Sequence, residues 1–456
     1  MKTKNKLFIS FFSSLIALTI VPLTIVGCSY RVVDQTVLTN FSHEVPKNTP
    51  YEVAYNLEYS FMMVNSDNVN ASKVFGTGWL FDYQIDNSSD DITCYFGTNL
   101  HVADALRNPY DNPSYVPENL KNVTNFASGE LLTTRFFYLG KYEVDPTKSL
   151  IATPVDITYY RIGSFDPKTP TKSSLPKTQF AATNFYSNNV TLYDSKRQNY
   201  YVDFAVLSMT FNKNDLIYQN WIANSINTLH ALVGTNNTYY VNKLFPLEAI
   251  NHTFLYSHKS YIAGYPYNKY ATYFAYPYLN IIYGSGFWSI NQPIDSKNEN
   301  AEIKYEGQPY DISMQSSIAN GFPTLMPGVY FPQLLDWKLE YHDVSYFQEG
   351  IGYVIHNSNL SGGSSGSLNI NQNNQIMGIY FGTWTYKTSN GDEHEVPYGL
   401  SQALRTSNSI QASNSITSKV IMNGYDLISG NENTAKSYKS SLQNVKTWLF
   451  SQNVQI

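Results

Sequence analysis

Residues 361–368 read SGGSSGSL, and residues 369–380 continue as NINQNNQIMGIY. The small residues predict a tight, exposed turn, and two short apolar runs around an Asn-rich turn predict a β-hairpin. A nucleophilic serine needs this setting, because a substrate carbonyl must approach it and nearby backbone N–H groups must be free to contact the oxyanion. Ser365 occupies the reactive position of this pattern. On its own, a Gly/Ser cluster is also typical of a linker or a plain turn.

An upstream segment supplies a candidate general base. Gly76 and Gly78 introduce a predicted strand over residues 75–81, and residues 93–97 return as its partner after an acidic turn. His101 follows directly. This order resembles trypsin-like folds, and the resemblance implies that His101 stands at the start of a short helical turn as the general base. A lone histidine is more often a surface or core group, and it is the preceding strand pair that singles this one out.

A third segment supplies a carboxylate. Residues 200–209 read YYVDFAVLSM, an apolar strand interrupted by Asp203. A charge inside such a run is costly unless it is paired. Residues 203–207, DFAVL, resemble the segment that supplies the acid of trypsin-like serine proteases. This resemblance implies that Asp203 accepts the imidazole N–H of His101 and holds its tautomer. The alternative is an aspartate near a strand end that simply faces water.

The chain order His101, Asp203, Ser365 resembles that of the chymotrypsin-type serine proteases. The resemblance implies a mostly β fold, namely a chymotrypsin-like double β-barrel with inserted strands and loops and a few helices. It also implies that His101 takes the proton of Ser365 as the serine attacks a peptide carbonyl, with the N–H groups of Gly363 and Ser365 as the oxyanion hole. We expect no cofactor and no metal for this chemistry.

Four short motifs narrow the resemblance: GTGW at 76–79, TNLHV at 98–102, AGYP at 263–266 and GSSGSL at 363–368. They are similar to the mycoplasma surface-lipoprotein peptidase family that includes the mycoplasma immunoglobulin protease, over residues 50–410 and again at 425–428. This resemblance implies cleavage of an extracellular protein, with immunoglobulin heavy chain as the family's substrate and a separate immunoglobulin-binding lipoprotein as partner. Ser364 stands where proteolytically activated trypsin-like enzymes have Asp, so we expect activity without such activation.

The N-terminus has the pattern of an export signal. Three lysines within the first six residues precede an almost uninterrupted apolar stretch, Leu7–Val26. The stretch ends at Gly27 and Cys28, which looks like a bacterial lipobox, so residues 1–28 are a predicted lipoprotein signal with lipid on Cys28. Residues 29–50 would then tether the body to the outer face of the cell membrane. The alternative is a single transmembrane helix, since the run is about long enough to span a bilayer.

The composition favours a packed, β-rich chain. Tyr (39) and Phe (25) are abundant, charged residues make up 14%, and 43% of residues are hydrophobic. With a net charge of −5 and no basic run beyond the N-terminus, the sequence does not predict nucleic acid as a partner. Cys94 lies in an apolar run, which predicts a buried small hydrophobe rather than a nucleophile. With Cys28 lipidated, no disulfide can form.

The remaining segments suggest one peptidase body with a tail. We expect the trypsin-like peptidase domain to cover residues 51–410 and a C-terminal extension to cover residues 411–456, with a terminal helix over Thr434–Phe450. Apolar spacing predicts an amphipathic helix over residues 213–232. The walls of the specificity pocket are expected near residues 353–360 and 381–390.

Two further motifs and two further functions are weaker alternatives. Gly284–Gly286 lacks a hairpin pattern, and Asp392–Glu395 reads as an exposed acidic turn rather than a metal site. A non-catalytic surface adhesin or binding module on the same fold would need no triad. A solute-binding transport lipoprotein would show two lobes of alternating strands and helices, which this sequence does not.

Overall fold

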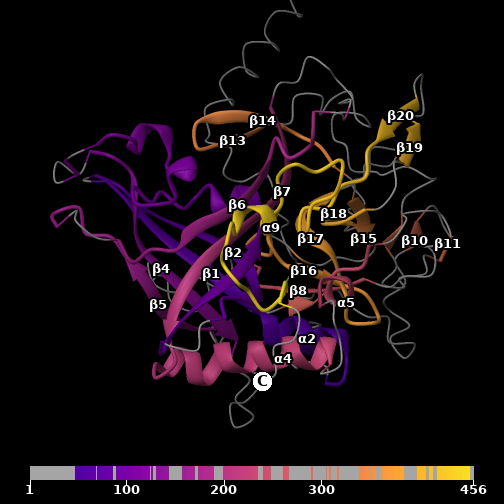
Figure 1. Cartoon of the computed structure of the whole chain (residues 1–456), viewed down its shortest axis with the longest axis horizontal. Helices are drawn as coiled ribbons and strands as arrows, with labels where there is room; N and C mark the ends of the chain where they lie inside the picture. Colours follow the sequence, from indigo (N-terminus) through magenta and orange to yellow (C-terminus); the bar gives the residue numbers. More distant parts are fainter. Residues whose placement is uncertain are drawn as a thin grey trace, which may run out of the picture.

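The computed structural model describes residues 47–451 apart from a number of gaps. The largest gaps cover residues 143–156, 191–198, 248–259, 267–288, 291–303, 318–337 and 385–397. The described chain is mostly β, which confirms the predicted fold class, and its strands form two large sheets (Figure 1). No ladder among the described strands closes either sheet into a barrel.

The N-terminal sheet has nine strands in the order β13-β14-β7-β3-β2-β1-β4-β5, with β6 also paired to β7. Its central strands β1, β2, β3 and β7 are antiparallel neighbours, and these include the strands predicted from the sequence around Gly76 and Asp203. The bounds are β1 Glu58–Ser66, β2 Ala71–Tyr83, β3 Asp91–Thr98, β4 Thr133–Tyr142, β5 Ile157–Ser164, β6 Lys177–Thr183, β7 Tyr200–Asn212, β13 Lys338–Tyr341 and β14 Val344–Gln348.

The C-terminal sheet has seven strands in the order β12-β15-β18-β17-β16-β8-β9. The predicted hairpin after Ser365 is confirmed, because β16 and β17 pair antiparallel around the Asn-rich turn. Two further two-stranded ladders, β10 with β11 and β19 with β20, lie outside this sheet. The bounds are β8 Tyr261–Gly264, β9 Ser289–Ile290, β10 Lys304–Tyr305, β11 Gln308–Pro309, β12 Ser316–Ser317, β15 Gly352–Ile355, β16 Leu368–Ile370, β17 Ile376–Trp384, β18 Tyr398–Ala403, β19 Ile410–Ser413 and β20 Lys419–Met422.

Two glycines in β2 permit close packing around a short helix, α3 (Leu100–Ala103), that directly follows β3. A Cβ at Gly76 would lie 2.4 Å from Cγ1 of Val102, so a larger residue would displace this helical turn. A Cβ at Gly78 would lie 2.0 Å from the ring of Phe61. Atoms at these distances overlap. A closely packed interior accommodates a larger side chain only at a cost in stability. The Gly-x-Gly pattern therefore reflects packing at the turn that carries the candidate base.

Two of the helices, α2 (Pro50–Leu57) and α4 (Ala223–Val233), lie together at the bottom of the view in Figure 1. The helix predicted over residues 213–232 is confirmed: it contains a π-helical turn at Tyr218–Ile222 and continues as α4. Its buried side chains face the core, and it packs beside α2. A short helix, α5 (Tyr240–Leu244), follows α4. Two 3-10 turns, Pro113–Tyr115 and Glu118–Leu120, complete the helical segments before β4.

The predicted terminal helix is wrong in extent. Only one turn of the stretch Thr434–Phe450 is helical, α9 at Tyr438–Ser441. Ser437 caps this turn through a capping box with Ser440, and Gln443 then adopts a left-handed backbone with φ of 54°. A helix cannot continue through that conformation.

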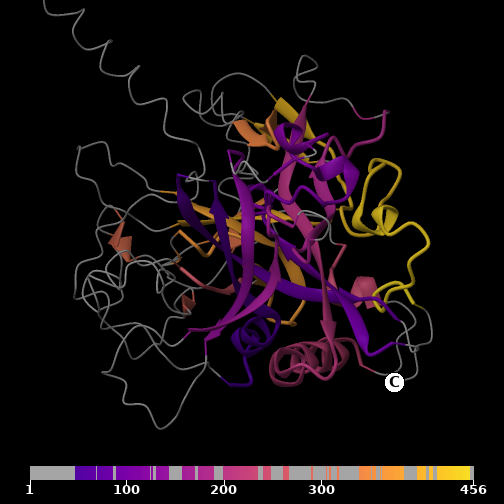
Figure 2. The ribbon, with the colours of Figure 1, turned by 90° about the vertical axis from the view of Figure 1, so that its left-hand side faces the viewer.

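Residues 423–450, here called the C-terminal strap, return from the C-terminal sheet to the N-terminal sheet (Figure 2). The hydroxyl of Tyr438 donates to Asp82 Oδ2 at 2.8 Å, and the backbone N–H of Leu449 donates to Asp82 Oδ1 at 2.8 Å. The N–H of Trp448 donates to the Tyr83 carbonyl at 2.9 Å. These main-chain bonds to β2 replace the bonds that a longer helix would make within itself.

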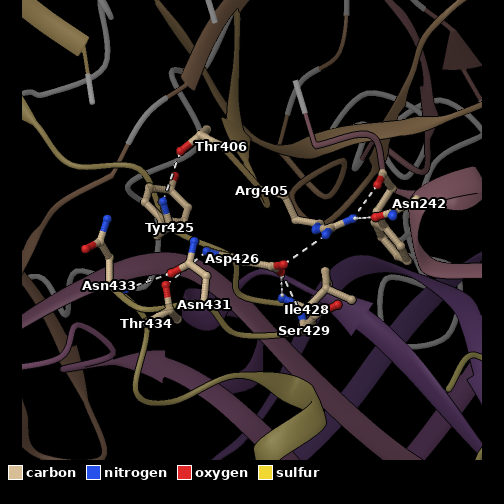
Figure 3. A network of polar contacts seen from close by, with 11 residues as sticks. Asn242, Arg405, Thr406, Tyr425, Asp426, Ile428, Ser429, Asn431, Asn433 and Thr434 are labelled. Carbon is tan, nitrogen blue, oxygen red and sulfur yellow. Dashed lines mark hydrogen bonds and ion pairs between the residues drawn. The ribbon is translucent and has the colours of Figure 1, made fainter. Parts of the chain in front are cut away.

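A buried ion pair anchors the start of the strap (Figure 3). Arg405, just beyond β18, lies 2.9 Å from Asp426 Oδ2, and both side chains are at most 4% exposed. Arg405 also donates to Asn242 Oδ1 and to the Phe245 carbonyl at α5. The other oxygen of Asp426 accepts N–H groups of the turn that follows it. These additional hydrogen bonds help to offset the cost of burying the two charges.

The predicted signal segment, the lipidation site Cys28 and most of the tether lie outside the described residues. Within residues 47–451, as far as they are described, no helix has the length and apolar character to cross a membrane. The boundary between peptidase domain and extension at residue 410 stays a prediction.

Candidate active site

His101 and Asp203 form the best-defined polar contact of the site. His101 belongs to α3, which begins immediately after β3, and Asp203 lies on the neighbouring strand β7. Nδ1 of His101 is 2.7 Å from Oδ2 of Asp203, and the backbone N–H of His101 donates to Oδ1 at 3.0 Å. One carboxylate therefore holds both the ring and the main chain of the histidine. With Nδ1–H donated to Asp203, Nε2 carries the lone pair that a general base needs.

Charge and burial shift the pKa of His101 in opposite directions. Burial lowers the pKa of the imidazole, but the neighbouring carboxylates of Asp203 and Asp104 outweigh it, so that its pKa is raised above the ordinary value of 6.5. The ring keeps access to solvent, since 24% of its side chain is exposed, whereas Asp203 is 5% exposed. A carboxylate held against the ring stabilises the imidazolium that forms when a base takes a proton.

Ser365 is bound to the strand that leads toward His101. The backbone N–H of Thr77 in β2 donates to the Ser365 carbonyl at 2.7 Å, and the Thr77 hydroxyl donates to the Gly363 carbonyl at 3.0 Å. The Thr77 carbonyl in turn accepts the hydroxyl of Thr98, at the end of β3. Ser365 itself is 4% exposed. Residues 362–367, here called the nucleophile loop after the role predicted for Ser365, are thereby attached to the N-terminal sheet beside α3.

Glycine at position 366 is required for this attachment. Its φ of +97° lies in the left-handed region, and a Cβ there would meet the Thr77 carbonyl oxygen at 1.9 Å. Any other residue would therefore be strained in its backbone and would push β2 away from the loop. This explains the small residue after the nucleophile that the sequence pattern requires.

The loop also orients a backbone donor. The Ser364 carbonyl accepts the N–H of Ser367 at 3.0 Å and its hydroxyl at 2.7 Å. In a trans peptide the N–H points away from the carbonyl, so the N–H of Ser365 is directed away from Ser367. Among the described residues, no acceptor is bound to the N–H groups of Gly363 or Ser365. These are the two donors predicted for an oxyanion hole.

Of the three predicted catalytic side chains, those of His101 and Asp203 are in direct contact. Within the described residues, the ring of His101 makes no hydrogen bond to the hydroxyl of Ser365. Free enzymes commonly lack this bond, which forms or tightens when substrate binds. Ser365 is instead linked to the pair through the backbone of β2 and β3.

The chain is similar in sequence to one family along most of its length. A sequence profile described as mycoplasma immunoglobulin protease matches residues 48–382. The chain belongs to this family.

Two uncharacterized lipoproteins are similar to this chain. One, from Mycoplasmoides gallisepticum, is 30% identical over 87% of this chain and 77% of its own length. The other, from Mycoplasma genitalium, is 29% identical over 88% of this chain and 78% of its own length.

Two solved structures align with this chain at low sequence identity. The structure of the mycoplasma MIB and MIP proteins gives a TM-score of 0.49 at 15% identity, with 84% of this chain covered and 60% of that chain. The active form of a protease from M. tuberculosis gives a TM-score of 0.27 at 11% identity, with 83% of this chain and 85% of that chain covered.

Three polar residues of this site were not predicted from the sequence. Thr77 binds the nucleophile loop, while Asn99 and Gln402 bind the main chain of Asp203. Thr77 stands between the two glycines of the Gly-x-Gly motif, which is a local signal. Gln402 is 199 residues away from Asp203 in the chain, and no local pattern points to it.

The other candidates divide into described and undescribed residues. Cys94 is fully buried and has a free thiol, which confirms the structural interpretation, and burial raises its pKa far above the ordinary value. Gly284–Gly286 and Asp392–Glu395 lie outside the described residues, as do residues 356–359 and 385–390 of the expected pocket walls.

Proposed function

We propose that this chain is a serine endopeptidase in which Ser365 is the nucleophile, His101 the general base and Asp203 the residue that orients the base. The observation that carries the proposal is the double contact of Asp203 with the ring and the backbone N–H of His101. A buried carboxylate that fixes an imidazole in this way, next to a loop with free backbone donors, suits acyl transfer.

The proposed steps follow the geometry. Nε2 of His101 removes the proton of Ser365 while the serine oxygen attacks the substrate carbonyl, and Asp203 stabilises the resulting imidazolium. The N–H groups of Gly363 and Ser365 receive the developing oxyanion. His101 then gives the proton to the leaving amine, and water repeats the sequence on the acyl-enzyme.

We extend the proposal to the substrate and the partner. The family is described by immunoglobulin cleavage, and one similar solved structure contains two mycoplasma proteins, MIB and MIP. We therefore propose immunoglobulin heavy chain as the substrate, presented by a separate immunoglobulin-binding lipoprotein. Incubation of the chain with immunoglobulin, with and without such a partner, tests this: a heavy-chain fragment that Ser365→Ala does not produce would support it.

Membrane attachment is the remaining part of the proposal. Relatives from two mycoplasma species are lipoproteins, and Cys28 follows an apolar stretch in a lipobox-like sequence. We propose that Cys28 carries lipid and that the body faces the outside of the cell. Labelled palmitate should enter the wild-type chain and not Cys28→Ser. External protease should degrade the body on intact cells, and its survival there would contradict the extracellular location.

A serine-reactive fluorophosphonate tests the chemistry. The full chain in detergent should be labelled, and Ser365→Ala should not. Ser89→Ala is the matched control, because Ser89 is an exposed serine that a non-specific reaction would reach before the 4% exposed Ser365. A folded wild type that is not labelled, with or without a partner protein, would favour a binding module on a peptidase fold.

A further inference from the structure

Within the described part of the chain, Asp203 has no register partner on the strands that flank β7. The ladder with β3 ends at Ala205, and the ladder with β6 is irregular between Ala205 and Tyr201. The parallel contact with β14 also stops at Tyr201. Irregular strand pairing of this kind redirects a side chain and is common next to active sites. Something other than a strand must therefore satisfy the peptide groups on either side of the catalytic carboxylate.

Two side-chain amides take the place of the missing strand. Nδ2 of Asn99 donates to the Asp203 carbonyl at 2.7 Å, and Oε1 of Gln402 accepts the Asp203 N–H at 2.9 Å. Both side chains are fully buried. Asn99 immediately precedes α3, the helical turn that carries His101. It therefore links the backbone of the aspartate to the start of the histidine turn.

Gln402 reaches Asp203 from the other sheet. It lies on β18, opposite Gly352 of β15 and Ile379 of β17, so strands on both sides hold its backbone. Its side chain is also fixed, because Oε1 accepts a second hydrogen bond from Gln348 and Nε2 donates to the Glu349 carbonyl. An amide bonded at both its oxygen and its nitrogen has a defined orientation, and here it ties Asp203 to the C-terminal sheet.

We propose that Asn99 and Gln402 are positioning residues of the active site, which together set the place of Asp203 and, through it, the orientation of the His101 ring. The inference rests on the proposed function, since the position of Asp203 matters to catalysis only if His101 serves Ser365. It adds that the proposed catalytic pair on the N-terminal sheet depends on the C-terminal sheet through the buried amide of Gln402.

Variants of similar volume without the polar groups test the proposal. Asn99→Leu removes the donor to the Asp203 carbonyl, and Gln402→Met removes the acceptor of its N–H. Asn108→Leu is the control, because Asn108 is also fully buried and donates to a backbone carbonyl, that of Pro176, without contact to the catalytic residues. Asn99→Ser serves as a third variant that adds no bulk, in case the larger replacements do not fold.

Two readouts separate positioning from a merely structural role. The first is the titration of the His101 ring by NMR, with its signal assigned through His101→Gln. Asp203 and Asp104 are the carboxylates that face this ring, and displacement of Asp203 leaves burial dominant, so the midpoint should fall in the test variants and stay unchanged in Asn108→Leu. The second is the rate of fluorophosphonate labelling, which should fall about a hundredfold, as misplacement of a catalytic group by roughly 1 Å can cause.

The outcomes distinguish this inference from the proposed function. If the wild type is labelled and the variants lose thermal stability without any change in the His101 midpoint, the positioning role is refuted while the enzyme stands. If the wild type is not labelled but the midpoint still falls in Asn99→Leu and Gln402→Met, the positioning role stands and the proposed catalysis does not.

Discussion

The hydroxyl of Thr77 offers a sharp test of how the nucleophile loop is held. It donates to the Gly363 carbonyl at 3.0 Å and accepts the N–H of Tyr265 at 3.2 Å, and Thr77 is fully buried. Thr77→Val keeps the shape of the side chain and the main-chain bond to Ser365 but removes both of these contacts. The change therefore isolates the hydroxyl.

The expected cost follows from the two groups that lose their partner. A buried carbonyl or N–H without a hydrogen bond costs about 1–3 kcal/mol, so Thr77→Val should lower the free energy of unfolding by about 2–6 kcal/mol. Thr77→Ser retains the hydroxyl and loses only a methyl group, at about 1 kcal/mol. Because Gly363 supplies one of the predicted oxyanion donors, Thr77→Val should also slow labelling by about tenfold or more.

Urea denaturation and the rate of fluorophosphonate labelling measure the two effects. The expected order for both is wild type, then Thr77→Ser, then Thr77→Val. If Thr77→Val retained the stability and the labelling rate of the wild type, the hydroxyl would not hold the loop, and the argument from these two contacts would fail.

Further predictions concern the pH profile and other buried contacts. Labelling requires neutral His101, whose pKa is raised above 6.5, so the labelling rate should fall to half its maximum at a pH above 6.5 as the pH is lowered. In Asp203→Asn the pH of half-maximal labelling should be lower, which a stopped-time labelling series would measure. Arg405→Met leaves Asp426 buried without its cation and should reduce the free energy of unfolding in urea by about 3–5 kcal/mol, whereas an unchanged value would mean the pair contributes nothing. The side chain of Glu58 accepts the N–H of Leu368 beside the nucleophile loop, so Glu58→Gln should be tolerated because its amide oxygen can still accept this hydrogen bond. Glu58→Leu should lower the free energy of unfolding by about 1–3 kcal/mol in the same assay, and equal loss in both variants would refute this account.

The parts of the fold that could be predicted are those with a local cause. The hairpin after Ser365 is marked by apolar runs and a turn within about a dozen residues. The amphipathic helix that becomes α4 is marked by the spacing of its buried positions. The turn of His101 follows a Gly-x-Gly strand because glycine is what allows Val102 to approach β2.

The terminal helix shows where local reasoning fails. The spacing over Thr434–Phe450 suits a helix, but the main chain near its end bonds to Asp82 and Tyr83 on β2 instead. Asp82 is fully buried. Leaving its oxygens without hydrogen-bond donors would cost more free energy than the loss of further helical turns in this stretch. The competing hydrogen bonds come from a strand more than 350 residues earlier in the chain, so the sequence of the stretch itself does not indicate them.

The candidate site depends on both sheets through contacts that cross between them. Thr77 holds the nucleophile loop, Glu58 holds the start of β16, and Gln402 holds Asp203, so each sheet supplies groups that fix a proposed catalytic residue of the other. These contacts are buried, and their donors and acceptors would lose their partners together if the sheets separated. Ser365 and Asp203 should therefore lose their positions in one step. Hydrogen exchange should detect that step as common protection of the Thr77, Leu368 and Asp203 amides, and independent exchange of the three would contradict it.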